Sequence, residues 1–137
     1  MKLNAYVAFN GNCADAFKFY EQCLGGKIVG MMKWGESPMA GQTAPEWRDK
    51  IMHARLEVGD QALMGADAPP NMFSGNHGFT VSITVNAKAE AERIFSAISE
   101  GAKVDMPLQQ TFWSPAFGML VDRFGIPWMV NCEAAQS

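Results

Sequence analysis

An internal repeat restricts the fold of this chain more than any other feature of its sequence. The segment LNAYVAFNGNCADAFKFYEQCLGGKIVG resembles FTVSITVNAKAEAERIFSAISEGAKVDM. One constant offset pairs Ala5 with Val81, Asn10 with Asn86 and Lys27 with Lys103. A repeat of this length indicates that the fold is built from two copies of one supersecondary unit.

Each copy is predicted to contain a strand, a helix and three further strands. Alternating apolar residues open both copies, as in a strand, and an apolar helical stripe follows. Asn12 and Asn86 are the expected N-caps, and Gly25 is the expected C-terminal stop of the first helix. The predicted stripes are Ala16, Phe19, Tyr20 and Cys23 in one copy, and Ala91, Ile94, Phe95 and Ile98 in the other. The later strands are expected at about 27–34, 49–58, 61–66, 104–111, 117–122 and 128–132.

These elements predict an α+β fold of two tandem βαβββ modules within one domain, residues 1–137. The modules are expected at roughly 1–67 and 77–133, joined by a connector at 68–76 that contains Pro, Asn and Gly. One helix covers only one face of a four-stranded sheet, so the other face needs a partner. We therefore expect a curved mixed sheet of eight strands around a concave groove, with the helices on the convex side.

Composition and charge exclude several classes of protein. The formal net charge is −3 and no Lys/Arg cluster is present, which argues against a nucleic-acid partner. No apolar stretch approaches the roughly 20 residues of a membrane span, and no signal-peptide core precedes Asn10. The three cysteines lack C-x-x-C spacing and are expected to be reduced and buried. The expected location is therefore the cytoplasm.

Three longer motifs extend the repeat into a family resemblance. They are LNAYVAFNGNCADAFKFYEQCLGG, PEWRDKIMHARLEVGDQALMGAD and QQTFWSPAFGMLVDRFGIPWMVNCE, and together they cover nearly the whole chain. The chain resembles the PhnB-like branch of the vicinal-oxygen-chelate superfamily, which includes glyoxalase I, fosfomycin-resistance proteins and extradiol dioxygenases. The resemblance implies a groove for a small molecule, and a homodimer.

In metal enzymes of this superfamily, ligands on the first and last strands of the modules point into the groove. The resemblance places these positions at or near Ala5, Thr80 and Met129. A shift of two residues in the last strand would instead bring in Asn131, with Asn4 on the first strand. Thioethers and neutral amides are poor ligands for hard divalent ions, so no metal is predicted. No dinucleotide or adenosylmethionine fingerprint is found, so no other cofactor is predicted either.

The candidate site residues come from the strands and loops expected around the groove. Alternation in DKIMHARLEVG places Met52, Ala54, Leu56 and Val58 on the helix side, and Ile51, His53, Arg55 and Glu57 on the other side. His53 is the candidate catalytic group, since imidazole exchanges protons near neutral pH. The predicted ligand-binding residues are Trp34, His53, Phe112, Trp113, Met129 and Asn131.

Three functions stay open at this point. The leading hypothesis is a metal-independent small-molecule-binding protein whose ligand the sequence does not identify. The alternative is a lyase or isomerase in which His53 and a carboxylate, Glu57 or Glu133, transfer protons without the usual metal. In the third, the groove is a dimerisation surface, and its aromatic residues pack against a second copy of the chain.

Overall fold

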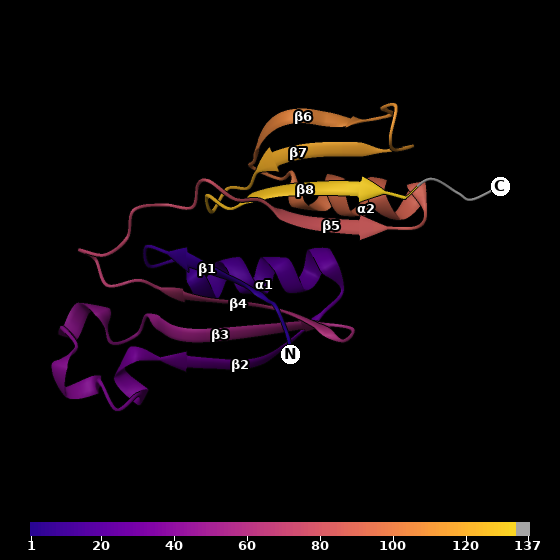
Figure 1. Cartoon of the computed structure of the whole chain (residues 1–137). Coiled ribbons are helices and arrows are strands. Elements are labelled where there is room, and N and C mark those ends of the chain that lie inside the picture. Colours follow the sequence, from indigo (N-terminus) through magenta and orange to yellow (C-terminus); the bar gives the residue numbers. More distant parts are fainter. Residues whose placement is uncertain (134–137) are drawn as a thin grey trace. The chain divides into compact units, whose positions relative to one another are not determined.

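The structure, a computed structural model, describes residues 1–133 and confirms the α+β fold class and its repeated module. The chain divides into two compact units, Met1–Gly75 and Asn76–Ser137. Each unit contains a strand, an α-helix and three further strands in that order (Figure 1). The unit boundary lies at the carboxyl end of the predicted connector 68–76.

The first unit is a mixed four-stranded sheet with one α-helix. Its strands have the order β1-β4-β3-β2, in which β1 pairs with β4 in parallel and the other pairs are antiparallel. The elements are β1 Ala5–Phe9, α1 Cys13–Leu24, β2 Lys27–Lys33, β3 Ile51–Val58 and β4 Gln61–Asp67.

The second unit repeats this topology. Its strand order is β5-β8-β7-β6, again with one parallel pair between the first and last strands of the module. The elements are β5 Val81–Val85, α2 Lys88–Ile98, β6 Lys103–Gln109, β7 Phe117–Val121 and β8 Pro127–Cys132.

The eight predicted strands are all present, but their hydrogen bonds form two sheets of four rather than one sheet of eight. Within residues 1–133, every strand pairs only with strands of its own unit. Each copy of the sequence repeat therefore forms one four-stranded sheet of its own. The concave groove, which depends on how the units pack together, stays a prediction.

Each core forms where the apolar stripe of the helix packs against its own sheet. The stripes of both helices are buried as predicted, with Cys13 and Phe17 added to the first. Val7, Phe9 and Leu56 of the first sheet are at most 1% exposed, as are Trp128 and Val130 of the second. The buried strand residues alternate with half-buried ones, so each sheet has one face against its helix and one face away from it.

The helix N-termini differ from the prediction. Asn12 occupies the N-cap of α1, but its side chain makes no cap hydrogen bond among the described residues. The carboxylate of Asp67 at the end of β4 accepts the N–H of Cys13 instead, at 3.0 Å. The N-cap of α2 is Ala87, so the prediction of Asn86 is wrong by one residue. Gly25 ends α1 with φ 72°, as predicted.

One face assignment on β3 is also wrong. Ala54 and Leu56 are buried and His53 lies on the other face, as predicted, but Ile51 is only 2% exposed. The pairing of β2 with β3 shifts between Met32 and Lys33, next to Ile51. Such an irregularity interrupts the two-residue alternation, which explains why the first residue of β3 enters the core.

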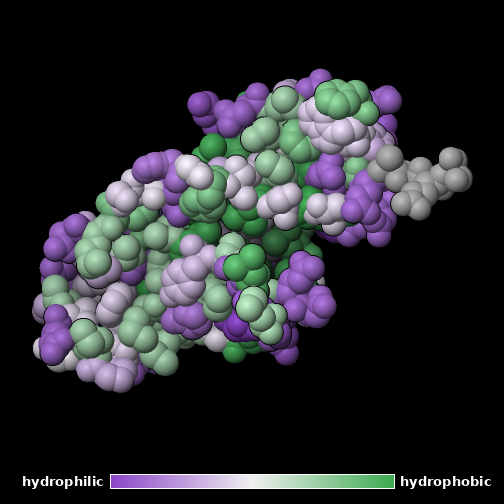
Figure 2. Space-filling model, in the orientation of Figure 1, coloured by the Kyte–Doolittle hydropathy of each residue, from purple (hydrophilic) through white to green (hydrophobic). Residues whose placement is uncertain are grey.

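The long β2–β3 connection contains three short 3₁₀ helices: η1 Trp34–Glu36, η2 Ala40–Gln42 and η3 Pro45–Trp47. Figure 2 shows hydrophilic and weakly hydrophobic side chains intermixed over this connection. Neither α-helix in residues 1–133 is long and apolar enough to cross a membrane.

Candidate functional site

Three of the six predicted ligand-binding residues, His53, Met129 and Asn131, lie on the face of their sheet that points away from the α-helix, here called the distal face. The distal face of the first unit contains Tyr6, Met32, His53, Arg55, Glu57 and Met64. That of the second unit contains Ser82, Thr84, Met106, Met119, Met129 and Asn131.

A cross-strand row runs over the middle of the first distal face. Tyr6 of β1 is paired with Met64 of β4, Met64 with Arg55 of β3, and Arg55 with Gly30 of β2. Directly paired residues of neighbouring strands have Cβ atoms about 5 Å apart and share one face. The row therefore brings a phenol, a thioether and a guanidinium together from segments far apart in the sequence.

His53 lies beside this row and has the Tyr6 hydroxyl as its polar partner. The Tyr6 Oη and His53 Nδ1 atoms are 3.2 Å apart, and the ring centroids are 5.8 Å apart at an interplanar angle of 34°. Burial, and to a smaller degree Cys13, raises the pKa of the Tyr6 phenol above its ordinary value. The phenol is therefore protonated at neutral pH and can donate to the imidazole.

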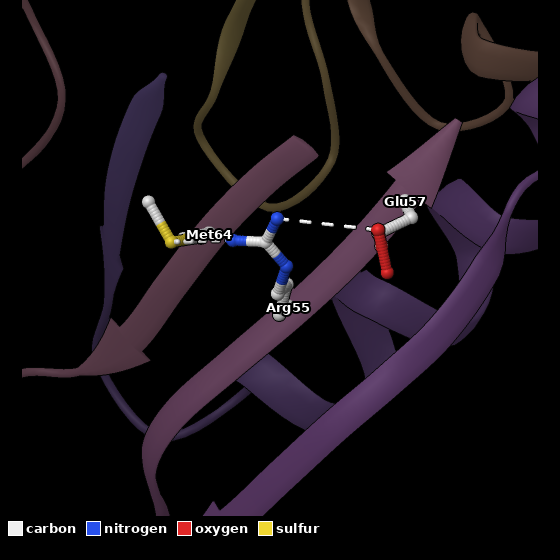
Figure 3. Close-up of polar contacts among 3 residues, drawn as sticks. All are labelled: Arg55, Glu57 and Met64. Carbon is white, nitrogen blue, oxygen red and sulfur yellow. Dashed lines mark hydrogen bonds and ion pairs between the residues drawn. The ribbon is translucent and has the colours of Figure 1, made fainter. Parts of the chain in front are cut away.

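The Arg55 guanidinium lies between Met64 and Glu57 (Figure 3). Its Nη1 is 3.6 Å from the Met64 thioether, and its Nη2 is 4.0 Å from Glu57 Oε2. The Arg55 and Glu57 side chains are 31% and 40% exposed. Because Glu57 is directed at Arg55, the structure gives His53 a phenol, rather than this carboxylate, as its neighbour.

The distal face of the second unit is dominated by methionine. Met106, Met119 and Met129 are consecutive cross-strand partners, and Ser82 completes their row. The burial pattern of β8 places the half-buried Met129 and Asn131 on the opposite face from the buried Trp128 and Val130. Half-buried thioethers in a row give an apolar surface that can adapt its shape to a ligand.

Asn131 contains a buried acceptor atom that the fold does not use. Its Oδ1 is inaccessible to solvent and has no hydrogen-bond partner within residues 1–133. Its cross-strand neighbours are Thr84 and Phe117. A buried acceptor without a donor costs free energy, so this amide is a ready partner for a donor group on a ligand.

The aromatic candidates have two different environments. Trp34 in η1 donates its Nε1–H to the Asp67 carbonyl oxygen at 3.1 Å, so its polar atom stabilises the first unit. Phe112 and Trp113 lie in the β6–β7 connection and are 97% and 48% exposed. The ring centroids of Phe112 and Trp113 are 4.7 Å apart in an edge-to-face arrangement, and those of Trp113 and Phe117 are 5.2 Å apart.

The positions expected for metal ligands need one correction. Ala5 alternates with the buried Val7 and Phe9 and so belongs to the helix side, whereas Tyr6 and Ala8 belong to the distal face. No group of three or more His, Cys, Asp or Glu side chains in residues 1–133 could hold a metal ion. The equivalent positions on β5 and β8 offer hydroxyls, a neutral amide and a thioether. This donor set does not fit a hard divalent cation.

The three thiols are free and buried in the described chain. Burial, and secondarily the charge of Asp67, raises the pKa of the Cys13 thiol far above its ordinary value. A thiol held in its protonated form is a poor nucleophile. Cys13 is therefore part of the core rather than part of a reactive site.

Sequence reasoning missed Tyr6, Met64 and Met119 as site residues. Alternation in AYVAF was a signal that could have placed Tyr6 opposite Val7 and Phe9. The alignment of Met64 with Arg55, and of Met119 with Met129, depends on strand register. Both pairs belong to hairpins closed by short turns, and the length and geometry of each turn fix that register.

Comparison with known proteins identifies relatives along the whole chain. The family model described as 3-demethylubiquinone-9 3-methyltransferase matches residues 1–131. Protein YjdN of Escherichia coli is 33% identical over 99% of this chain and 98% of its own length.

Similar solved structures also extend over nearly the whole chain. The crystal structure of protein PA1353 from Pseudomonas aeruginosa has 50% identity and a TM-score of 0.90, covering 97% of this chain and 98% of that one. A PhnB protein from Bacillus cereus, a putative 3-demethylubiquinone-9 3-methyltransferase, has a TM-score of 0.80 at 22% identity, covering 96% and 99%. A glyoxalase/bleomycin resistance protein/dioxygenase family enzyme from Burkholderia phytofirmans shares the fold at a TM-score of 0.64 and 16% identity, covering 96% and 97%.

The matched length, the βαβββ units and these relatives lead to one assignment. The chain belongs to the family described as 3-demethylubiquinone-9 3-methyltransferase, and it shares the fold of a solved glyoxalase/bleomycin resistance protein/dioxygenase family enzyme.

Proposed function

We propose that this chain binds a small organic molecule on its distal faces without a catalytic metal. The observation that supports this most is the composition of those faces, where half-buried thioethers and rings surround a few polar groups with unused hydrogen-bonding capacity. Arg55 and Asn131 are the clearest of these groups. Ligand sites commonly combine an apolar lining with a few such polar atoms.

The residues proposed to contact a ligand are, in the first unit, Trp34 and His53, with Tyr6 and Arg55 added from the structure, and, in the second unit, Phe112, Trp113, Met129 and Asn131. The donor chemistry of the first and last strands of each module supports a site that works without a divalent ion. Protein purified without chelator should contain well under one equivalent of zinc, nickel or manganese by elemental analysis. A stoichiometric metal would contradict the proposal.

Binding itself is tested by native mass spectrometry of the protein isolated from its expression host. A retained small molecule, lost on substitution of Met129 or Asn131, supports the proposal. A protein that retains nothing and shows no thermal shift across a chemically diverse library contradicts it.

A second candidate function is proton transfer by His53, and the contact with Tyr6 favours it. The 3.2 Å separation fixes one ring nitrogen against a protonated phenol and leaves the other for a substrate. A lyase or isomerase of this kind would use His53 and Tyr6 rather than His53 and Glu57. The enzyme reading predicts a bell-shaped pH–rate profile on a screened reaction, abolished by His53→Asn.

The family description names a methyltransferase, and the β1–α1 turn argues against extending that activity to this chain. Adenosylmethionine sites commonly use a glycine-containing turn between a strand and a helix. Here the N–H groups of Gly11 and Cys13 both donate to Asp67 Oδ1, at 2.8 and 3.0 Å. Those amides are therefore not free for a cofactor. Millimolar adenosylmethionine should leave the melting temperature unchanged.

We also propose that both units form one folding domain, that the protein is a cytoplasmic homodimer, and that it has no nucleic-acid partner. The free thiols and the net charge of −3 support the location and the lack of a nucleic-acid partner. Sedimentation of a monomer at micromolar concentration would contradict the dimer. Expression of residues 1–75 alone should give no cooperative unfolding transition if the units depend on each other.

A further inference from the structure

We infer that Arg55 binds the carboxylate of a monoanionic organic ligand on the distal face of the first unit. This inference rests on the proposed binding function and specifies the chemistry of the molecule bound. It is argued from the contacts of the guanidinium, from its neighbours on the face, and from the equivalent position in the second unit.

The guanidinium has more donors than the fold satisfies. Arginine has five N–H donors in a planar fork. Among residues 1–133, the Arg55 guanidinium contacts a thioether sulfur at 3.6 Å, which is a weak acceptor, and a carboxylate oxygen at 4.0 Å, which is beyond hydrogen-bond length. At 31% exposure, much of this side chain is removed from water. A carboxylate bound by both arms of the fork would satisfy these donors.

The neighbours of Arg55 favour one particular kind of carboxylate. Glu57 lies on one side of the guanidinium, so a second negative charge on the ligand would be repelled (Figure 3). Met64 lies on the other side and presents an apolar surface. Beyond Met64 in the same row, Tyr6 and its partner His53 offer polar atoms. The arrangement fits a single carboxylate joined to a flat apolar body.

The second unit shows that this charge is not required by the fold. Met119 occupies the position of Arg55, because each is the β-strand neighbour of a methionine on the last strand of its module, Met64 or Met129. The same topology therefore forms with a neutral thioether at this place. Of these two equivalent positions, the charged one lies on the face that also contains Tyr6 and His53, which points to recognition rather than packing.

The test uses benzoate as the probe and benzamide as its neutral, nearly isosteric partner. Binding of each to the full chain is measured by titration in solution, following protein resonances. Wild type should bind benzoate at least tenfold more tightly than benzamide, because charge-assisted bidentate bonds are stronger than neutral ones. Terephthalate, with a second carboxylate, should bind more weakly than benzoate.

Three variants test whether the preference for benzoate depends on Arg55. Arg55→Met copies the second unit and should weaken benzoate binding at least tenfold while leaving benzamide binding within twofold. Arg48→Met, at an exposed arginine of the same unit, removes the same charge and should change benzoate affinity less than twofold. Glu57→Gln should strengthen benzoate binding severalfold, because the competing carboxylate is gone.

The outcomes separate this inference from the proposed function. If benzoate and benzamide bind equally, or if Arg55→Met binds benzoate like wild type, the carboxylate assignment is wrong while small-molecule binding stands. If neither probe binds and the diverse library also gives no hit, both are wrong. Near-ultraviolet circular dichroism of each variant confirms that it is folded, and Arg55→Lys, which keeps the charge without the fork, should show an intermediate affinity.

Discussion

The two units share one topology, and the rows across their distal faces show where they diverge. In the first unit the row reads Tyr6, Met64, Arg55 and Gly30, and in the second it reads Ser82, Met129, Met119 and Met106. Only the methionine of the last strand is common to both. The helix side changes much less, since both units bury apolar residues there. The repeat thus preserves each core and leaves the distal faces free to differ.

The ends of the last strands show a second difference. Asp67 ends β4 and accepts N–H groups of Gly11, Cys13 and Ile51 at 2.8, 3.0 and 2.8 Å. In the second unit the hydroxyl oxygen of Ser114 lies 2.8 and 2.7 Å from the carbonyl oxygens of Ala116 and Cys132, and its one hydrogen can be donated to either. A charged group therefore joins strand and helix ends in the first unit, whereas in the second a neutral hydroxyl joins the β6–β7 connection to the end of β8.

The largest loss of stability should come from Asp67→Ala, which removes the carboxylate that accepts the three backbone N–H groups. The substitution leaves the buried N–H groups of Cys13 and Ile51 without an acceptor, so we expect a loss of about 3–5 kcal/mol in the free energy of unfolding. Urea denaturation measures it. Glu92→Ala, at an exposed helix position, is the control and should change stability by less than about 0.5 kcal/mol. Equal losses for both variants would refute the assigned role.

A smaller loss of stability is expected at two glycines that lie against an aromatic ring of the α-helix. A Cβ on Gly65 would lie 2.8 Å from the Val7 carbonyl oxygen and 2.9 Å from the Phe17 ring, and one on Gly118 would lie 2.7 Å from the Phe95 ring. Gly65→Ala and Gly118→Ala should each cost about 1–3 kcal/mol by overpacking. Thermal or urea unfolding measures the cost.

Gly30 provides the matched control for these two substitutions. It lies in a strand of the first unit, and a Cβ there would have no atom within 4 Å. Gly30→Ala should therefore leave stability unchanged or raise it slightly. Destabilisation by Gly30→Ala equal to that of Gly65→Ala would show that overpacking is not the cause of the loss at Gly65.

The pH dependence of stability should reveal the buried Cys13 thiol of the first unit. Its pKa in the folded chain is raised above the ordinary value of 9.0, so the fold holds the proton that the unfolded chain releases. Above about pH 9, unfolding releases a proton, and stability falls by up to about 1.4 kcal/mol per pH unit. Below pH 9 the contribution is fully present.

Urea denaturation at pH 7.5 to 10 checks this expectation. Cys13→Ala should remove the additional alkaline slope, although its stability at neutral pH will be lower because of the small cavity. Keeping the pH below 10 limits any contribution from Tyr6, whose raised pKa acts in the same direction at higher pH. Parallel pH profiles for wild type and Cys13→Ala would contradict the assignment.

The smallest stability effect should come from Phe112→Ala in the second unit. The ring is 97% exposed, so its removal should change the free energy of unfolding by less than about 0.5 kcal/mol. If Phe112 contacts the ligand, as we propose, affinity should fall while stability does not. A stability loss above about 1 kcal/mol would show that the ring packs against something in solution.

Much of the fold was predictable because its signals are local. The buried stripe of α2 consists of the four predicted residues, and Gly25 ends α1 as expected. The candidate site was predictable in part, since alternation correctly placed His53 away from the core. Asn12 was placed correctly at the N-cap, but the Asp67 carboxylate of a distant segment, rather than the Asn12 side chain, accepts the first helical N–H. The face of Ile51 was wrong because the irregular pairing of β2 with β3 interrupts the alternation there.

The sequence by itself determined the repeated βαβββ order and the apolar stripes. These follow from residue type and periodicity, which a linear chain displays directly. The tertiary structure alone decided that Tyr6 meets His53, that Arg55 lies between Met64 and Glu57, and that Asp67 joins β1, α1 and β3. Such neighbours depend on strand register and on the packing of whole faces, and not on any one segment alone.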